Sequence, residues 1–142
     1  MADILSPAQR SERMSRITGK NTAPELALRK VLLRLGLRYR LHGARLVGKP
    51  DLVFPRHKAV VFVHGCFWHR HLGCRIAATP KSNTLYWTDK FDKNVARDER
   101  VSAALTEQGW RVFVVWECEL ASSRKAKDTG EKLAALIRRP QD

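Results

Sequence analysis

The sequence lacks the features that membrane, secreted and repetitive proteins require. Its longest uninterrupted apolar runs, such as Ala59–Val63 and Val112–Trp116, contain five residues each, whereas a membrane-spanning helix needs about 20. No apolar segment near the start resembles a signal peptide, and the sequence contains no low-complexity tract or internal repeat. We therefore expect a soluble, cytoplasmic protein without a membrane partner, whose 142 residues form a single globular domain, residues 1–142.

Cysteine is also scarce in this chain. Cys66, Cys74 and Cys118 are its three cysteines, and an odd number cannot all pair as disulfides within one chain. Because no secretory signal is present, we expect a reducing compartment, in which clustered cysteines serve as metal ligands more often than as disulfides.

Acidic residues are the third scarcity. The chain has 27 Lys and Arg but only 14 Asp and Glu, which gives a formal net charge of +13. Its first 49 residues hold 11 basic and 3 acidic residues, a local charge of +8. Nucleic acid is the leading partner for such a surface, because each phosphate that it neutralises releases counterions. A solubilising surface and adhesion to an anionic membrane are the alternatives.

Hydrophobic periodicity and turn residues predict helices and strands in mixed order. Thr22 and Glu25 form a capping-box pattern that begins a helix, and Gly36 ends it. The run Ala59–Val63 is apolar throughout, which is typical of a central strand covered on both faces. The other predicted elements are strands at Leu37–Leu41, Asp51–Phe54 and Trp110–Trp116 and helices at Thr84–Gln108 and Lys132–Arg138. This order predicts a three-layer α/β fold with helices flanking a central sheet.

Metal-binding residue types cluster in the segment that ends at Cys74. Four residues separate Cys66 from His71, two separate His71 from Cys74, and 43 separate Cys74 from Cys118, which follows a predicted strand. Three thiolates and one imidazole form a closed tetrahedral Zn²⁺ set, which is structural rather than catalytic. The alternatives are three buried free thiols, or His69 as the ligand in place of His71.

Asp51 is the candidate catalytic carboxylate. It lies at the start of one predicted strand, beside the end of the next, and carboxylates are preferred Mg²⁺ ligands. Such a metal polarises a phosphate and stabilises charge on the leaving oxygen, while a nearby histidine accepts the proton of the attacking water. Each residue also has a structural interpretation: Pro50–Asp51 as a turn, His64 as a core histidine, and Glu25 as half of its capping box.

The motif HGCFWHRHLGC at residues 64–74 is more specific for one protein family than any of the candidate residues above taken singly. It closely resembles the signature of the very-short-patch repair endonucleases, the Vsr family of DNA mismatch nicking enzymes. Four further motifs agree with the family in order and spacing: Asn21–Glu25, Gly48–Asp51, Lys93–Asp98 and Gly109–Cys118. The resemblance covers nearly the whole chain and becomes weaker after Leu120, so we assign no function to the tail.

The resemblance implies a restriction-endonuclease-like fold with a central mixed sheet and a structural zinc site. It implies strand-specific nicking of double-stranded DNA 5′ to the thymine of T:G mismatches, which arise when 5-methylcytosine deaminates. Asp51 would be the Mg²⁺ ligand and His69 the general base, with Glu25 and His64 as supporting catalytic residues. The zinc ligands that match the family are Cys66, His71, Cys74 and Cys118, which selects His71 over His69.

The resemblance also implies residues that contact DNA. Phe67, Trp68 and Trp87 match aromatic residues that the family inserts beside the mismatch, where a weakly stacked T:G pair costs less to open. A core position is the alternative, above all for Trp87. The basic residues expected at DNA are Arg10, Arg13 and Arg16 of an N-terminal arm, residues 1–20, and Lys93 and Arg97 of the long helix. For the arm, a solvated helical face is the alternative.

One position departs from the family. Val63 stands where the best-known members carry threonine, so valine suits a Mg²⁺ site only if the backbone carbonyl is the ligand. Two other functions compete with mismatch nicking: restriction-type cleavage of unmismatched duplex, and zinc-stabilised DNA binding without catalysis. Asp51 and His69 argue against a non-catalytic DNA-binding protein. The aromatic residues argue against restriction-type cleavage. We expect a monomer, with other mismatch-repair proteins as further partners that only the resemblance implies.

Overall fold

The protein folds around one mixed β-sheet. The structure, a computed structural model, describes residues 22–43, 45–71, 73–74 and 81–139. Within these residues the sheet has four strands, which lie side by side in chain order: β1 (Arg40–Leu41), β2 (Leu52–Phe54), β3 (Ala59–His64) and β4 (Arg111–Trp116). β2 pairs antiparallel with β1 and with β3, whereas β3 pairs parallel with β4. The predicted arm with Arg10, Arg13 and Arg16 lies outside the described residues.

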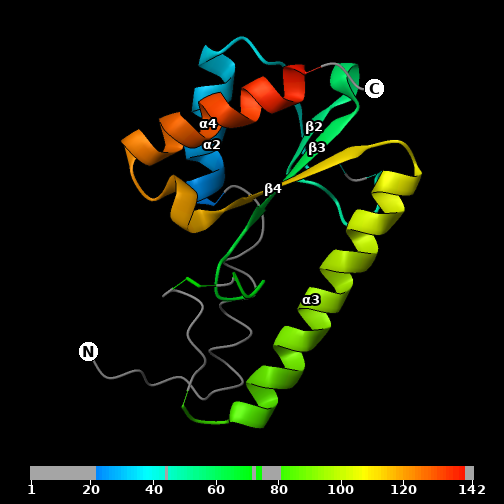
Figure 1. Ribbon diagram of the computed structural model, residues 1–142, viewed down its shortest axis with the longest axis vertical. Helices are drawn as coiled ribbons and strands as arrows, with labels where there is room; N and C mark the ends of the chain where they lie inside the picture. The colour runs from blue at the N-terminus through cyan, green and yellow to red at the C-terminus, as the bar shows by residue number, and fades with distance from the viewer. Residues whose placement is uncertain (1–21, 44, 72, 75–80, 140–142) are drawn as a thin grey trace.

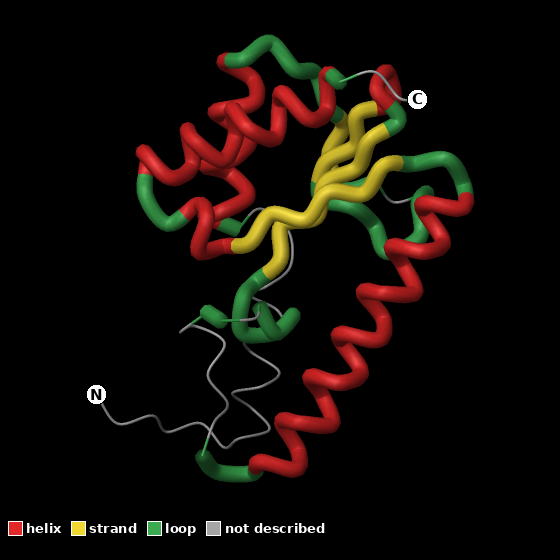
Figure 2. The backbone as a smooth tube through the Cα atoms, viewed as in Figure 1, coloured by secondary structure: helices red, strands yellow, loops and turns green. Residues whose placement is uncertain are grey.

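Helices cover both faces of the sheet. α2 (Ala23–Arg34) and α4 (Ser123–Arg138) lie on one side, and α3 (Thr84–Glu107) runs along the other and extends past the end of the strands (Figures 1 and 2). Two short 3₁₀ helices, η1 (Pro55–His57) and η3 (Glu117–Leu120), connect these elements. The layers confirm the predicted three-layer α/β fold. None of the helices in the described part of the chain is both long and apolar enough to cross a membrane.

Alternation of side chains along the strands divides the core in two. Phe54 and Val61 belong to the larger cluster, which packs beneath α2 and α4. Val53 and Val60 point the other way and pack against Leu105 of α3. The second cluster is small, because residues from the same face of the sheet also line the cavity described below.

The helix predictions near the N-terminal end and in the middle of the chain are confirmed. The Thr22 hydroxyl accepts a hydrogen bond from the Glu25 N–H at 3.4 Å, and α2 begins directly after this cap. Gly36 has a φ of 82°, a left-handed conformation that favours glycine, two residues after α2 ends. α3 ends at Glu107, one residue before the predicted end.

Three other elements differ from the predictions. β1 is limited to Arg40–Leu41 and does not begin at Leu37. α4 begins at Ser123 rather than Lys132, with Ser122 as its N-cap. Its first half carries mainly polar and small residues, so it lacks the apolar periodicity of the second half. β4 was expected to be a buried strand, but it lies at the edge of the sheet and Val114 is 41% exposed. An apolar run is therefore compatible with an edge strand that borders a cavity.

Gly130 sets the closest contact between α2 and α4. A Cβ atom placed on Gly130 would lie 2.3 Å from Cγ1 and 3.0 Å from Cβ of Val31. The side chain of Val31 is β-branched and has little rotamer freedom in a helix, so it cannot simply turn away. The two helices can thus approach this closely only because Gly130 has no side chain.

We predict that Gly130→Ala lowers the free energy of unfolding by about 1 kcal/mol, because overpacking costs about 1–3 kcal/mol and outweighs the gain of about 1 kcal/mol in helix propensity. In a Val31→Ala background the same substitution should instead be stabilising. Urea unfolding of the two single variants and the double variant measures both effects. The packing argument is wrong if Gly130→Ala is stabilising in both backgrounds.

Candidate active site and metal centre

A cavity of about 350 Å³ opens between the sheet and α3 at the end of β3. Asp51, His64 and His69 line it from the strand side, and Arg97 and Asp98 line it from α3. Three predicted site residues, from two motifs that are separate in the sequence, thus meet in one cavity. Arg97, predicted to contact DNA, lies at the same opening.

Asp51 is held by the backbone of the neighbouring strand. Its Oδ2 accepts a hydrogen bond of 2.7 Å from the N–H of Val63. Burial is the main cause that raises the pKa of the carboxyl from 3.8 to about 7; the negative charge of Glu25 contributes to this shift, and the Val63 N–H opposes it. A cation next to this carboxylate would reverse the effect of burial, which is the property expected of a metal ligand.

Glu25 is one of the most deeply buried charged residues, with 1% of its surface exposed. Its carboxylate forms an ion pair with Arg29 and lies 3.2 Å from Nε2 of His42. It is therefore not turned back onto the helix N-terminus, and the capping-box interpretation of its side chain is wrong. The negative charge of Glu25 raises the pKa of Asp51. The two carboxylates therefore lie close to each other.

His64 and His69 form a stacked pair of imidazoles. The ring centroids are 3.9 Å apart, with an interplanar angle of 7°. Burial, the largest cause, and the adjacent His69 together lower the pKa of His64 to about 4. Nδ1 of His69 lies 2.5 Å from Oδ2 of Asp98, which leaves Nε2 as the nitrogen available for proton transfer. The pair therefore combines one neutral histidine with one that a carboxylate orients.

Asp98 is the main functional candidate that sequence reasoning missed. It lies within a motif that resembles the family, Lys93–Asp98, but no role was assigned to it. One turn earlier on α3, the side chain of Asn94 donates a hydrogen bond of 3.3 Å to the carbonyl of Trp68. The spacing of four residues places both side chains on one helix face, and this was the signal available in the sequence.

Donor atoms of His64, His69 and Asp98 lie within 4.8 Å of one another, a distance compatible with a metal ion. The lone pairs of an imidazole lie in its ring plane, however, and the two rings are nearly parallel. Their lone pairs therefore do not converge on one point. The geometry favours proton transfer over metal binding for this group.

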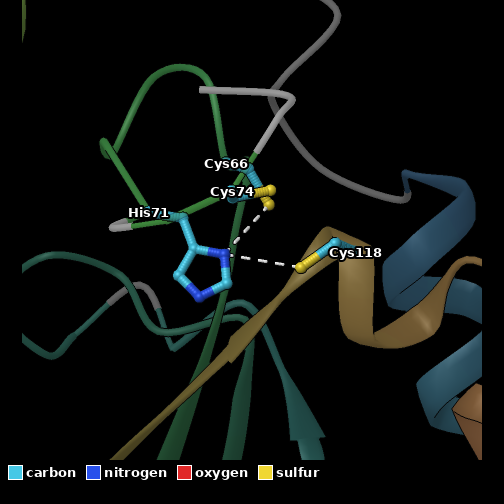
Figure 3. Close-up of side chains that lie close together, drawn as sticks. All are labelled: Cys66, His71, Cys74 and Cys118. Atoms are coloured by element: carbon cyan, nitrogen blue, oxygen red, sulfur yellow. Dashed lines mark hydrogen bonds between the residues drawn. The ribbon is translucent and has the colours of Figure 1, made fainter. Parts of the chain in front are cut away.

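A second cluster lies just beyond the catalytic cavity. Figure 3 shows the loop after β3 bringing Cys66, His71 and Cys74 toward Cys118, which lies on η3 after β4. Nδ1 of His71 is 3.7 Å from Sγ of Cys66 and 3.4 Å from Sγ of Cys118. One donor atom from each of the four residues lies within 4.8 Å of the others. Three thiols and an imidazole that converge in this way fit a tetrahedral metal centre.

Neighbouring groups hold this cluster in place. The ring of His71 stacks on Trp116 with centroids 4.3 Å apart, and Oε1 of Glu117 accepts a hydrogen bond of 2.9 Å from the N–H of Cys66. Burial raises the pKa of the Cys66 thiol to about 12 and also raises that of Cys118. A bound metal would instead deprotonate the coordinating thiols. Because His69 bonds to Asp98, His71 is the histidine that faces the sulfur atoms.

The three aromatic residues predicted at DNA pack together with Phe91. Ring centroids lie 5.1 Å apart between Phe67 and Trp68 and 5.5 Å apart between Phe67 and Trp87. Trp68 and Trp87 are each only 6% exposed, whereas Phe67 is partly buried. The structure thus shows them as a small aromatic cluster between the metal loop and α3. Their insertion into DNA stays a prediction that requires this cluster to open.

Lys93 and Val63 complete the set of selected residues. Lys93 is exposed on α3 and lies 3.0 Å from Oδ2 of Asp89. Val63 contributes its backbone N–H to Asp51, so its main chain borders the catalytic carboxylate. Its carbonyl as a metal ligand stays a prediction, as does the contact of Lys93 with DNA.

Solved structures contain a related fold. The catalytic domain of the homing endonuclease I-Bth0305I aligns with a TM-score of 0.52 over 83% of this chain and 99% of that chain, at 21% sequence identity. At this identity the likeness shows the fold alone. The mixed sheet and its flanking helices are restriction-endonuclease-like, as predicted.

Sequence comparisons identify the family. The family model described as DNA mismatch endonuclease Vsr matches residues 2–75. The type II nicking enzyme V.XorIIP of Xanthomonas oryzae pv. oryzae is 54% identical over 121 residues, 85% of this chain and 88% of the relative. The type II nicking enzyme V.NmeAIP of Neisseria meningitidis is 44% identical over 142 residues, 100% of this chain and 99% of the relative.

The DNA mismatch endonuclease Vsr of Escherichia coli is 43% identical over 128 residues, which cover 90% of this chain and 81% of the relative. The match to the Neisseria meningitidis relative spans the whole chain, so the matched region includes both sites described above. With the fold and these relatives in agreement, the chain belongs to the Vsr family of DNA endonucleases.

Proposed function

We propose that the protein nicks one strand of duplex DNA on the 5′ side of the thymine in a T:G mismatch, by Mg²⁺-dependent hydrolysis. The observation that carries the proposal is the meeting of Asp51 with the His69–Asp98 pair in one cavity. A carboxylate with a raised pKa beside an oriented histidine is suited to hydrolysis of a phosphodiester. The names of the relatives, nicking enzymes and a mismatch endonuclease, support the finer specificity.

The chain supplies the proton transfer itself. Nε2 of His69 accepts the proton of the attacking water, while Asp98 fixes the ring and stabilises its positive charge at Nδ1. His64 is neutral because its pKa is about 4, so it donates or accepts a hydrogen bond without adding charge. It supports the orientation of His69 through the stacked contact of the two rings.

Asp51 and the backbone carbonyl of Val63 would hold the Mg²⁺ ion, and Glu25 would support its water shell. The donor set fits, because oxygen ligands are those that Mg²⁺ prefers and the burial of Asp51 calls for a positive partner. When bound, such an ion stabilises negative charge on the phosphate oxygens. Arg97, on the opposite wall of the cavity, is available to contact the phosphate backbone.

Reading of the mismatch is assigned to Phe67, Trp68 and Trp87. A T:G pair stacks weakly, so separating it from its neighbour costs less than separating a matched pair. Stacking of aromatic rings on bases recovers about 1–3 kcal/mol per base, which compensates for opening the aromatic cluster. One chain carries one cavity of this kind among its described residues, which agrees with cleavage of a single strand by a monomer.

The cluster of Cys66, His71, Cys74 and Cys118 is assigned to a structural Zn²⁺ ion. Sulfur and imidazole ligands favour zinc over magnesium, and four protein ligands leave no open position for catalysis. Such an ion would connect the loop that carries Phe67, Trp68 and His69 to the end of β4. Its function is therefore to keep the general base and the aromatic residues in place.

The first test is a single-turnover nicking assay with Mg²⁺ on duplexes that carry a central T:G or the matched C:G, with either strand labelled. We expect cleavage of the thymine strand alone, and only in the mismatched duplex. Asp51→Asn should reduce the rate at least about 1,000-fold, because a catalytic metal contributes several kcal/mol and about 1.4 kcal/mol corresponds to tenfold.

Asp89→Asn, at an exposed position on α3, is the matched control and should retain activity. Equal cleavage of the matched duplex would replace the proposal with restriction-type cleavage. Tight DNA binding without cleavage in any sequence context would replace it with a non-catalytic, zinc-stabilised DNA-binding protein.

A second test measures stability without activity. Because the pKa of Asp51 is about 7 in the folded protein and near 3.8 when unfolded, the folded state binds more protons between these values. The unfolding free energy of the Mg²⁺-free protein therefore falls, through this group, as pH rises from about 4 to 7. We predict that Asp51→Asn is stabilising relative to wild type at pH 8, with a smaller difference at pH 4.

Urea unfolding at both pH values, with and without Mg²⁺, measures this difference. Asp128→Asn, the same substitution at an exposed position on α4, controls for the lost charge. Added Mg²⁺ should stabilise the wild type at pH 8 and leave Asp51→Asn unchanged. A stabilisation by Mg²⁺ that is equal in both proteins would place the metal elsewhere.

A third test concerns zinc. We predict that the purified protein contains one equivalent of Zn²⁺ and that His71→Ala and Cys118→Ser lose it. The thermal midpoint should fall by roughly 10 °C or more, because a structural zinc contributes several kcal/mol to folding. His57→Ala, a histidine outside the cluster, should keep the metal. Retention of zinc by His71→Ala together with its loss from His69→Ala would assign the ligand to the other histidine.

A further inference from the structure

A second hollow, of about 600 Å³, lies at the end of the sheet opposite the catalytic cavity. Its walls come from the turn after α2, from β1, from η1 and from the last turn of α4. β3 begins two residues after His57 of its wall and ends at His64 of the first cavity, and its six residues span roughly 17 Å along an extended strand. The two hollows are thus separate surfaces.

Arginine dominates this hollow, which we term the arginine pocket. It is lined by Arg38, Arg40, Arg56 and Arg138, and none of its described lining residues is acidic. Arg138 is used within the fold, because its guanidinium donates to the carbonyl of Leu35 at the end of α2. Positive charge therefore gathers in a concave surface without a carboxylate to neutralise it.

The other three arginines of the pocket are not held by a hydrogen bond of this kind within the described residues. Within the described part of the chain, the side chains of Arg38, Arg40 and Arg56 form no hydrogen bond or ion pair, and all three residues are exposed. Tyr39 lies between the first two and packs on Phe54, with ring centroids 6.0 Å apart. Because side chains alternate along an extended segment, this contact directs Arg38 and Arg40 to the opposite side together. The pocket is thus built on an anchored edge of the sheet.

The neighbouring polar groups are already satisfied by another arginine. The guanidinium of Arg111 donates to the carbonyls of His57, Leu136, Ile137 and Arg139. The carbonyl groups at the end of α4 are therefore bonded without help from Arg38, Arg40 or Arg56. Their positive charge is available for a ligand from outside the chain.

We propose that the arginine pocket binds the phosphate backbone of a second DNA duplex while the first occupies the catalytic cavity. Guanidinium groups bind phosphate oxygens with two parallel hydrogen bonds, and duplex DNA presents one charge per about 1.7 Å, so that adjacent phosphates reach adjacent arginines. DNA is favoured over an acidic protein because the chain is a DNA endonuclease with a net charge of +13. This inference rests on the proposed function only for the position of the first duplex in the catalytic cavity.

Such a site would give the protein a DNA-bridging activity. An enzyme that holds two segments can pass directly from one to the other, which shortens the search for a rare target. The catalytic residues lie at the other end of β3, so a loss of bridging should leave nicking of a single short duplex unchanged.

The experiment captures one duplex with another. Mismatched duplex is fixed to beads and saturated with protein at near-physiological salt without added Mg²⁺, and a labelled matched duplex is then added. We expect wild type to retain the labelled duplex. The triple variant Arg38→Gln, Arg40→Gln, Arg56→Gln should retain at least tenfold less, and the slope of log affinity against log salt should fall by about 2–3.

The matched control is Lys30→Gln, Arg34→Gln, Lys127→Gln, which removes the same charge from exposed positions of α2 and α4. It should bridge as wild type does, and both variants should bind the fixed duplex and unfold in urea like wild type. The proposal is overturned if wild type does not bridge, if both variants lose bridging equally, or if the pocket variant retains it.

Polyglutamate of equal total charge serves as a competitor. If it releases the labelled duplex as effectively as unlabelled DNA does, the pocket selects acidic chains in general and the assignment to DNA is wrong. Nicking of a free mismatched duplex is measured separately for all three proteins. If the proposed function is wrong, the nicking assay shows it. If the bridging proposal is wrong, only the retention of labelled duplex on the beads shows it.

Discussion

Parallel pairing of β3 with β4 brings both sites to one edge of the sheet, because the two strands end at the same edge. The register sets His64 opposite Trp116. Beyond these residues the backbone continues from β3 to Cys66 and from β4 to Cys118. The pairing therefore also brings together the two halves of the metal centre. Trp116 then provides the surface on which the ring of His71 stacks. A shift of one residue would turn His64 to the other face of the sheet and separate the cysteines.

The long helix α3 is the second element on which the sites depend. Three successive parts of it contact the loop after β3: Trp87 and Phe91 pack on Phe67, Asn94 bonds to the Trp68 carbonyl, and Asp98 bonds to His69. One helix therefore links the aromatic cluster to His69. Under the proposed function, a displacement of the aromatic residues by bound DNA would be transmitted to His69 along this helix and would couple recognition to catalysis.

Local patterns in the sequence were sufficient for a large part of this structure. The metal cluster was predictable because three of its ligands lie within nine residues and every cysteine is used. α2 and α3 were predictable from a cap and from sustained periodicity. The beginning of α4 was not, since Ala126 and Gly130 are buried by virtue of being small rather than apolar in a regular pattern. The role of Asp98 was also hidden, because its partner lies 29 residues away and the contact exists only after α3 packs on the sheet.

The three carboxylates of the site differ in how the chain neutralises them. Glu25 has Arg29 and His42, and Asp98 has His69. Asp51, half-buried beside Glu25, accepts a backbone N–H but forms no ion pair among the described residues. In a chain of charge +13 this is not a shortage of cations; under the proposed function, Asp51 would take its cation from solution. A basic surface draws the phosphate backbone toward the protein, but a lysine or arginine at Asp51 would compete with a metal for the same carboxylate. Leaving Asp51 without one lowers the stability of the metal-free fold and keeps the carboxylate available to a divalent ion, which is the compromise between stability and function expected at an active site.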